Sequence, residues 1–411
     1  MTKRYPGLIL KKGKESFLER FHPWLFSGAV ASKEGDPREG DIVEIRSSSG
    51  RYLATGHYQQ GSICARLFSF SQQEIGRTFW LEKIRAAYAL REKLFLVQNP
   101  LTNAYRLVFS EGDGLPGLIL DYYNGIYVMQ CHSEGMYREK ETVVSILQEL
   151  YGETLRAVYD KSSSTLPGRG KNLPDIDISD TTDTSPVKIS GKFLFGSGDR
   201  AEILETGHRF LVDFIRGQKT GFYLDQRSNR MFAQFYAKGW KVLNAFCYSG
   251  AFSVYALKGG AIQVHSADSS GQALEWAVEN VELNGIEPGR HRTVEADMKR
   301  FLSETDETWD MIILDPPAFA KSHSVSHNAL QAYIHINTAA MKRLNPGGIL
   351  FTFSCSQAIG REVFRSSLLT AALAAGRKAQ VLHHLSQGPD HPVSIFHPEG
   401  EYMKGAVIGI E

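Results

Sequence analysis

Cysteines are few in this sequence, and long apolar runs are absent. The four cysteines lie far apart and form no CxxC pair, so neither a disulfide framework nor a zinc ribbon is indicated, and we predict no metal site. No stretch reaches the ~18 consecutive apolar residues of a membrane-spanning helix. The apolar run near the start, GLIL, is too short for the core of a signal peptide. We therefore expect a cytoplasmic protein with no membrane partner.

An excess of charge of either sign is also lacking, since 46 basic and 45 acidic residues give a formal net charge of +1. No overall field therefore demands an anionic partner. The distribution is uneven, because residues 1–33 hold seven Lys or Arg against two Glu, a net charge of +5. Lys11, Lys12 and Lys14 in this stretch are candidates for contacts with RNA phosphates, and a solvated basic surface is the alternative.

The hydrophobic pattern changes along the 411 residues and divides them into three domains. Residues 1–75 alternate apolar and polar positions in short strands, which predicts a small β-barrel. Residues 76–205 begin with a helical pattern over 79–96 and continue as an α+β domain. The segment 161–190 is rich in Ser, Thr, Asp and Pro, which predicts a long loop. Residues 206–411 contain alternating strands and helices, the pattern of a parallel sheet covered on both faces.

We predict seven strands in this last domain. In an open α/β sheet, ligands bind outside the carboxyl ends of the strands, at the topological switch point. Five features fall at such ends: NAFCYSGAF, Asp268, Asp297, DPPAF and SCS. Their coincidence indicates an active site at this edge of the sheet.

The first three features indicate a nucleoside cofactor. The motif NAFCYSGAF reads as strand, turn and helix start, but it lacks the second and third glycines of GxGxxG, so a diphosphate site is disfavoured. Asp268 can accept hydrogen bonds from ribose hydroxyls, and Asp297 can meet an adenine amino group; the alternative for each is a helix N-cap. S-adenosylmethionine is a nucleoside cofactor without a diphosphate. The turn adds four candidate cofactor-binding residues: Phe246, Tyr248, Ser249 and Gly250.

The motif DPPAF follows the fourth strand of the predicted sheet. Pro316 and Pro317 lack backbone N–H groups, which leaves carbonyl groups available to accept hydrogen bonds from a nucleobase. Phe319 can stack on a flipped base, and Asp315 can bind the base edge or the cofactor. An ordinary Asp-Pro turn is the alternative.

Six segments together resemble the bacterial PUA-domain 23S ribosomal RNA cytosine-5 methyltransferases. They are HPWLFSGAV (22–30), GDGLPG (112–117), KTGFYLDQR (219–227), DPPAF, FSCS and DHPV with PEGEYMKG (390–405), in the same order over nearly the whole chain. The resemblance implies an N-terminal PUA domain that binds RNA, a central α+β domain and a C-terminal class I methyltransferase domain with a Rossmann-like sheet. It also implies that Thr220, Asp225 and Gln226 help to enclose S-adenosylmethionine; a capped helix start at Asp225 is the alternative.

The substrate implied by the resemblance is large-subunit ribosomal RNA, naked or in an early assembly intermediate. The sequence does not determine the oligomeric state, and a homodimer is one of the states it allows. One departure bears on the base that is modified. Many RNA cytosine-5 methyltransferases carry a second cysteine after the fourth-strand Asp-Pro, where this chain has Pro317 and Ala318. A single cysteine after the fifth strand also resembles the uracil-5 methyltransferases.

Cys355, in the segment FTFSCSQ, is the predicted nucleophile, although a cysteine at a strand end is more often a small buried hydrophobe. Its thiolate would attack C6 of the pyrimidine and activate C5 for methylation, with Asp315 stabilising the base. The following SQAIGREV can start a helix whose amides favour a thiolate. Cys247 is the rival nucleophile. Glu399 and His391 are candidates for the base that removes the C5 proton.

Three other functions compete with this hypothesis. Methylation of an exocyclic nucleobase nitrogen would also use an Asp-Pro-Pro-aromatic motif and needs no cysteine. A ribosome-binding factor with a vestigial methyltransferase domain would not bind the cofactor. A zinc base deaminase is disfavoured, because the chain has no HxE with PCxxC.

Overall fold

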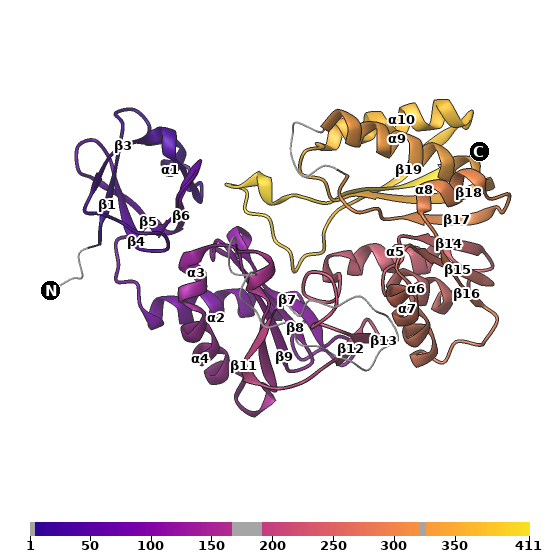
Figure 1. Cartoon of the computed structure of the whole chain (residues 1–411), viewed down its shortest axis with the longest axis horizontal. Helices are drawn as coiled ribbons and strands as arrows, with labels where there is room; N and C mark the ends of the chain where they lie inside the picture. Colours follow the sequence, from indigo (N-terminus) through magenta and orange to yellow (C-terminus); the bar gives the residue numbers. More distant parts are fainter. Residues whose placement is uncertain (1–4, 167–190, 320–325) are drawn as a thin grey trace. The chain divides into compact units, whose positions relative to one another are not determined.

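The structure is a computed structural model that describes residues 5–166, 191–319 and 326–411 (Figure 1). Most of the predicted loop 161–190 lies outside the described residues. The chain divides into two compact units, each assembled from separate stretches of sequence. Unit 1 consists of Met1–Ile203, Val212–Leu224 and Pro389–Gly400, and unit 2 of Leu204–Leu211, Asp225–Gly388 and Glu401–Glu411.

The N-terminal part of unit 1 is a six-stranded sheet in the order β2-β6-β5-β4-β1-β3. Its elements are β1 (Gly7–Leu10), α1 (Ser16–Glu19), β2 (Trp24–Phe26), β3 (Val30–Glu34), β4 (Ile42–Arg46), β5 (Tyr52–Tyr58) and β6 (Ile63–Ser69). Alternate apolar side chains such as Leu8, Leu10, Val43 and Ile45 are fully buried in one core. The short strands predicted at the start of the chain are therefore confirmed.

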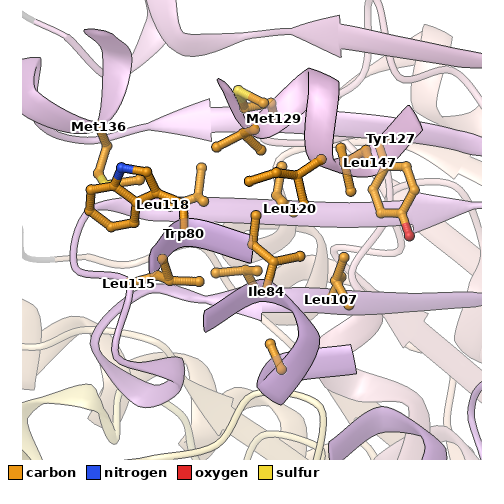
Figure 2. Packing of buried hydrophobic residues seen from close by; sticks show 14 of the residues in the cluster. Trp80, Ile84, Leu107, Leu115, Leu118, Leu120, Tyr127, Met129, Met136 and Leu147 are labelled. Carbon is orange, nitrogen blue, oxygen red and sulfur yellow. The ribbon is translucent and has the colours of Figure 1, made fainter. Parts of the chain in front are cut away.

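The central part of unit 1 is a five-stranded sheet, in the order β11-β10-β9-β8-β7, with helices packed on it. Its elements are α2 (Arg77–Lys93), β7 (Ala104–Phe109), β8 (Leu118–Tyr123), β9 (Ile126–Cys131), α3 (Glu134–Arg138), α4 (Lys140–Tyr151), β10 (Ala157–Asp160) and β11 (Lys192–Gly196). Figure 2 shows Trp80 and Ile84 of α2 among the leucines of the sheet, including Leu118 and Leu120 of β8. The predicted connector helix is thus part of this core.

Unit 2 contains a seven-stranded sheet in the order β16-β15-β14-β17-β18-β20-β19, which confirms the predicted number of strands. The strands are β14 (Lys241–Ala245), β15 (Gln263–Asp268), β16 (His291–Glu295), β17 (Trp309–Leu314), β18 (Leu344–Ser354), β19 (Ala379–Leu385) and β20 (Lys404–Ile410). Strand β20 runs antiparallel to both of its neighbours, β18 and β19, and the other pairs of this sheet are parallel. Chain order reverses between β14 and β17, which makes their carboxyl ends the switch point where ligands bind.

Helices cover both faces of this sheet, as expected for a parallel sheet with buried apolar strands. They are α5 (Arg227–Tyr236), α6 (Ala251–Lys258), α7 (Gly271–Leu283), α8 (Met298–Glu304), α9 (Ser326–Lys342) and α10 (Arg361–Ala375). Figure 1 shows α5, α6 and α7 on one face and α9 and α10 on the other. The predicted hairpin before the sheet is confirmed as β12 (Ala201–Glu205) and β13 (His208–Val212). No helix in the described ranges is long and apolar enough to cross a membrane.

Candidate active site

The turn after β14 has an unusual backbone. Phe246, Tyr248 and Gly250 have φ angles of 59°, 47° and 74°, in the left-handed region. A residue other than glycine is strained when its backbone lies in this region, and such strained residues concentrate at functional sites. A Cβ at Gly250 would lie 2.7 Å from the Cβ of Ala277 on α7, so only glycine lets the turn pack this closely. The turn is therefore a strained and closely packed segment at the switch point.

Asp268, at the end of the neighbouring strand β15, holds this turn in place through hydrogen bonds to backbone N–H groups. One carboxylate oxygen accepts a hydrogen bond from the Tyr248 N–H at 3.0 Å, and the other accepts from the Ser270 N–H at 3.1 Å. The side chain of Ser270, not that of Asp268, caps α7. The N-cap alternative for Asp268 is therefore wrong. Each carboxylate oxygen has a further lone pair that can accept from a ligand hydroxyl.

Asp297 is exposed and is the N-cap of α8, where its carboxylate accepts a hydrogen bond from the Arg300 N–H at 2.9 Å. The helix-cap alternative is therefore confirmed for this residue. The expectation that Asp297 ends the third strand is wrong, because β16 ends at Glu295. Contact between Asp297 and adenine stays a prediction.

Asp315 directly follows β17, and its carboxylate is bound by the residue that precedes α5. Gln226 donates from Nε2 to the Asp315 carboxylate at 2.9 Å and accepts from Asn229 at its Oε1 at 2.6 Å. Asp225, beside Gln226, accepts a hydrogen bond from the Tyr402 hydroxyl at 2.5 Å. The structure thus joins Gln226 and Asp315 by a hydrogen bond, while Asp225 has a separate partner in Tyr402. Asp225 does not cap α5, since Gln226 occupies the N-cap position.

The rest of DPPAF combines exposed and packed positions. Pro316 is buried, whereas Pro317 is exposed. The ring of Phe319 is half-buried, with its centroid 4.8 Å from that of Tyr333 on α9. The Lys299 ammonium also lies 4.9 Å from the Phe319 centroid. One aromatic ring is therefore partly accessible beside Asp315.

Thr220 belongs to unit 1, unlike the other cofactor candidates. Its buried hydroxyl donates to the Asp121 carboxylate at 2.6 Å, and Asp121 also forms a bidentate pair with Arg106 at 2.7 Å. The Tyr123 hydroxyl lies 3.1 Å from the Thr220 hydroxyl. This network holds Thr220 within unit 1.

Cys355 follows β18 directly and is half-buried, whereas Cys64, Cys131 and Cys247 are buried. Burial raises the pKa of the Cys64 thiol to about 11 and that of Cys131 to about 12. Burial, and next the charge of Asp268, raises the pKa of Cys247 well above its usual value. A buried thiol with a raised pKa is a poor nucleophile, so Cys247 is disfavoured as the rival of Cys355.

Helix α10 begins at Arg361, with Gly360 as its N-cap. Five residues separate Cys355 from this helix, so the expectation that helix amides directly follow the cysteine is wrong.

Two other side chains approach Cys355 instead. Burial raises the pKa of Tyr333 to about 12, and the charges of Cys355 and Asp315 act in the same direction. Lys404, at the start of β20, donates from its ammonium to the Ser356 carbonyl at 2.7 Å.

Sequence reasoning missed Tyr333 and Lys404 as site residues. Tyr333 lies in a helical pattern with no motif of its own. Lys404 belongs to the segment PEGEYMKG, which contributes to the family resemblance without assigning a role to the lysine. A lysine at the start of an apolar strand, YMKGAVIGI, is the one local signal that could have drawn attention to it.

The remaining candidates lie in unit 1. His391 is buried and its Nδ1 lies 3.1 Å from the Asp390 carboxylate, whereas Glu399 is exposed over half of its side chain. Lys11, Lys12 and Lys14 are exposed in the segment after β1. The Lys11 ammonium donates to the Gly28 carbonyl at 2.9 Å. Three basic side chains are therefore available to solvent in this segment.

The geometry of the β14 turn fits S-adenosylmethionine. The left-handed backbone around Gly250 packs the turn closely against α7, and Asp268 has acceptor positions for ribose hydroxyls. The absence of a second and third glycine agrees with a cofactor that carries no diphosphate.

Comparisons with known proteins agree with this fold. A family model described as S-adenosylmethionine-dependent methyltransferase matches residues 182–394, and one described as PUA-like domain matches residues 8–70. The chain is 39% identical over 407 residues to "Ribosomal RNA large subunit methyltransferase I" of Aeromonas salmonicida, with 98% of each chain covered. It is also 39% identical over 403 residues to the protein of that name in Yersinia pseudotuberculosis, covering 97% of this chain and 98% of the relative.

Solved structures show the same fold. A putative S-adenosylmethionine-dependent methyltransferase from Streptococcus mutans superposes with a TM-score of 0.80 at 22% identity, over 98% of this chain and 99% of that one. A putative methyltransferase crystallised with SAH gives a TM-score of 0.81, also at 22% identity and with the same coverage. The fold is therefore a class I methyltransferase domain preceded by a PUA-like domain. With this fold and these relatives, the chain belongs to the S-adenosylmethionine-dependent methyltransferases, in the family of ribosomal RNA large subunit methyltransferase I.

Proposed function

We propose that this protein methylates C5 of a cytosine in large-subunit ribosomal RNA, through a covalent adduct with Cys355. The names of the relatives at 39% identity support the RNA substrate. The observation that carries the chemistry is the position of Cys355. It is the half-buried cysteine of the four, at the carboxyl end of β18, and β18 pairs with β17, the strand that Asp315 directly follows.

The pyrimidine C5 is a weak nucleophile, so the protein must raise its electron density. The Cys355 thiolate forms a bond to C6, and the electron pair of the C5–C6 double bond moves toward C5. Asp315 binds the base edge and stabilises the charge that develops on the ring. S-adenosylmethionine, when bound, supplies the methyl group. Loss of the C5 proton and elimination of the Cys355 sulfur then restore the aromatic ring and the enzyme.

Further residues serve binding in this proposal. The cofactor is held by Thr220, Asp225, Gln226, Phe246, Tyr248, Ser249, Gly250, Asp268, Asp297 and Asp315. The target base is held by Pro316, Pro317 and Phe319, and RNA phosphates by Lys11, Lys12 and Lys14. Glu399 and His391 stay the candidates for removal of the C5 proton.

Several wider features belong to the same proposal. The RNA is naked or in an early assembly intermediate, which implies a cytoplasmic location, and a homodimer is one oligomeric state that the proposal allows. The domains have the boundaries 1–75, 76–205 and 206–411.

The proposal is tested with large-subunit ribosomal RNA transcribed with 5-fluorocytidine. Fluorine cannot leave C5 as a cation, so the wild-type protein with S-adenosylmethionine should form an adduct that resists denaturation and maps to Cys355. Cys355→Ser should bind cofactor and RNA but give neither adduct nor 5-methylcytidine. Cys247→Ser is the matched control and should retain the adduct. Methylation by Cys355→Ser at the wild-type rate would end the covalent mechanism, and a methyl group on an exocyclic nitrogen would identify the competing reaction.

A further inference from the structure

Lys404 is a buried cation anchored beside the proposed nucleophile. In the antiparallel pairing of β18 with β20, its Cα lies opposite that of Ser354, the residue before Cys355. Its ammonium donates to the Ser356 carbonyl at 2.7 Å and to the Tyr402 carbonyl at 2.8 Å. The backbone on both sides of Cys355 is therefore held by one lysine of β20.

Burial of the Lys404 ammonium is energetically unfavourable, so another contribution must account for its presence. Lys404 is 5% exposed, and among the residues that the structure describes no carboxylate forms an ion pair with it. The acidic neighbour Glu401 is itself paired with Arg361. Two neutral carbonyl acceptors compensate a buried ammonium only in part, because an unpaired charge loses much of its hydration energy. Such arrangements are typical of functional sites rather than of stabilising contacts.

The charges around Lys404 and Cys355 explain what the cation does. Burial lowers the pKa of Lys404, while the negative charge of a Cys355 thiolate acts to raise it; Arg361 acts to lower it and Glu401 to raise it. The attraction is mutual, so the ammonium favours the thiolate form as the thiolate favours the ammonium. Burial raises the pKa of Tyr333 on α9, and the negative charges of Cys355 and Asp315 act in the same direction. Lys404, whose ammonium donates to the carbonyl of the residue after Cys355, supplies a positive charge near a Cys355 thiolate.

We propose that Lys404 stabilises the thiolate of Cys355 and thereby sets the pH range in which this cysteine reacts. This inference rests on the proposed function for its use in catalysis. The Cys355 proton leaves to solvent, Lys404 keeps its three protons, and the sulfur electron pair then forms the bond to C6. Lys404 is thus a positioning residue that acts through Cys355 and not a group that exchanges protons with the substrate.

The test measures how fast iodoacetamide alkylates Cys355 as a function of pH, with peptide mass mapping to separate it from the three buried cysteines. Lys404→Met removes the charge and the anchoring donor, whereas Lys404→Gln removes the charge and keeps a donor for the Ser356 carbonyl. In both variants the midpoint of the rate profile should rise by about one pH unit, which slows alkylation near neutral pH about tenfold. Lys404→Arg should restore most of the wild-type profile.

Lys378→Met is the matched control, because Lys378 is exposed in the same unit and should leave the midpoint unchanged. Circular dichroism and S-adenosylmethionine binding check that each variant is folded. The proposal would be overturned if folded Lys404→Gln had the same midpoint of the alkylation profile as the wild type. It would also be overturned if Lys404→Arg raised this midpoint as much as Lys404→Gln does.

The two proposals fail in different ways. If Cys355 is not the nucleophile, the wild-type protein gives no adduct with 5-fluorocytidine RNA at any pH, while the alkylation shift caused by Lys404→Gln remains. If only the role of Lys404 is wrong, the adduct forms and its pH profile is the same in wild type and Lys404→Gln.

Discussion

Asp268 shows how a single carboxylate serves both the protein and a ligand. It uses one lone pair on each oxygen for backbone N–H groups of the β14 turn and of the residues before α7. These contacts orient the carboxylate before any ligand arrives, and a preoriented acceptor loses little entropy on binding.

We expect Asp268→Ala to weaken S-adenosylmethionine binding by about 1.5–3 kcal/mol, the range for hydrogen bonds to a charged group. Isothermal titration calorimetry on the purified protein provides the measurement. Asp268→Asn keeps an acceptor for the Tyr248 N–H and should lose less affinity than the alanine variant. Unchanged affinity in a folded Asp268→Ala protein would leave the residue with a purely structural role in the turn.

At the scale of single residues, motifs in the sequence predict site candidates, whereas residues outside any motif are not predicted. Asp268, Asp315 and Cys355 each follow an apolar strand, so the strand pattern alone places them at one edge of the sheet. Lys404 has no such signal, because its burial results from pairing between β18 and β20, which are far apart along the chain. Long-range pairing of this kind is not encoded in a local pattern.

At the scale of elements, strands were predicted better than helix starts. The seven strands of the unit 2 sheet follow from apolar runs and their spacing, and the structure confirms them. The start of α10 was misjudged because SQAIGREV was read as one continuous helix start, whereas the helix begins only after Gly360, its N-cap.

The segment after β1 carries a prediction about RNA. Reversing the charge of Lys11, Lys12 and Lys14 to Glu should weaken binding of ribosomal RNA. It should also lower the slope of log K against log salt by about one unit for each phosphate that a lysine no longer neutralises. Filter binding at several salt concentrations gives both quantities.

The control for this experiment replaces three exposed lysines elsewhere with Glu, which changes the net charge by the same amount as the test variant. These lysines are Lys93, Lys238 and Lys378. The control should retain most of the salt slope. If the two triple variants behave alike, the segment after β1 is merely a solvated basic surface.

At the scale of the whole molecule, a buried ion pair holds a distant segment in unit 1. Arg91 of α2 is fully buried, forms a bidentate pair with Asp113 at 2.5 and 2.8 Å, and donates to the Asp390 carbonyl at 2.9 Å. Asp390 lies 299 residues further along the chain, in the part of unit 1 that follows β19.

Arg91→Met should therefore lower the stability of unit 1 by about 3–5 kcal/mol, because it leaves the Asp113 carboxylate buried without its partner. Urea unfolding followed by fluorescence provides the measurement. Arg85→Met, on the same helix but in an exposed pair with Glu149, is the control and should cost less than about 1 kcal/mol. Equal unfolding midpoints for the two variants would contradict the structural role of the buried pair.

The composition of unit 1 has a consequence for how the protein is made. Domains usually fold in order as a ribosome releases them, starting with the N-terminal one. Here unit 1 includes Pro389–Gly400, which is translated only after the whole of Asp225–Gly388. Until then Arg91 and Asp113 lack the Asp390 carbonyl that completes their buried contacts. Unit 1 of the nascent chain therefore remains incomplete, and accessible to chaperones and proteases, while nearly all of unit 2 is synthesised.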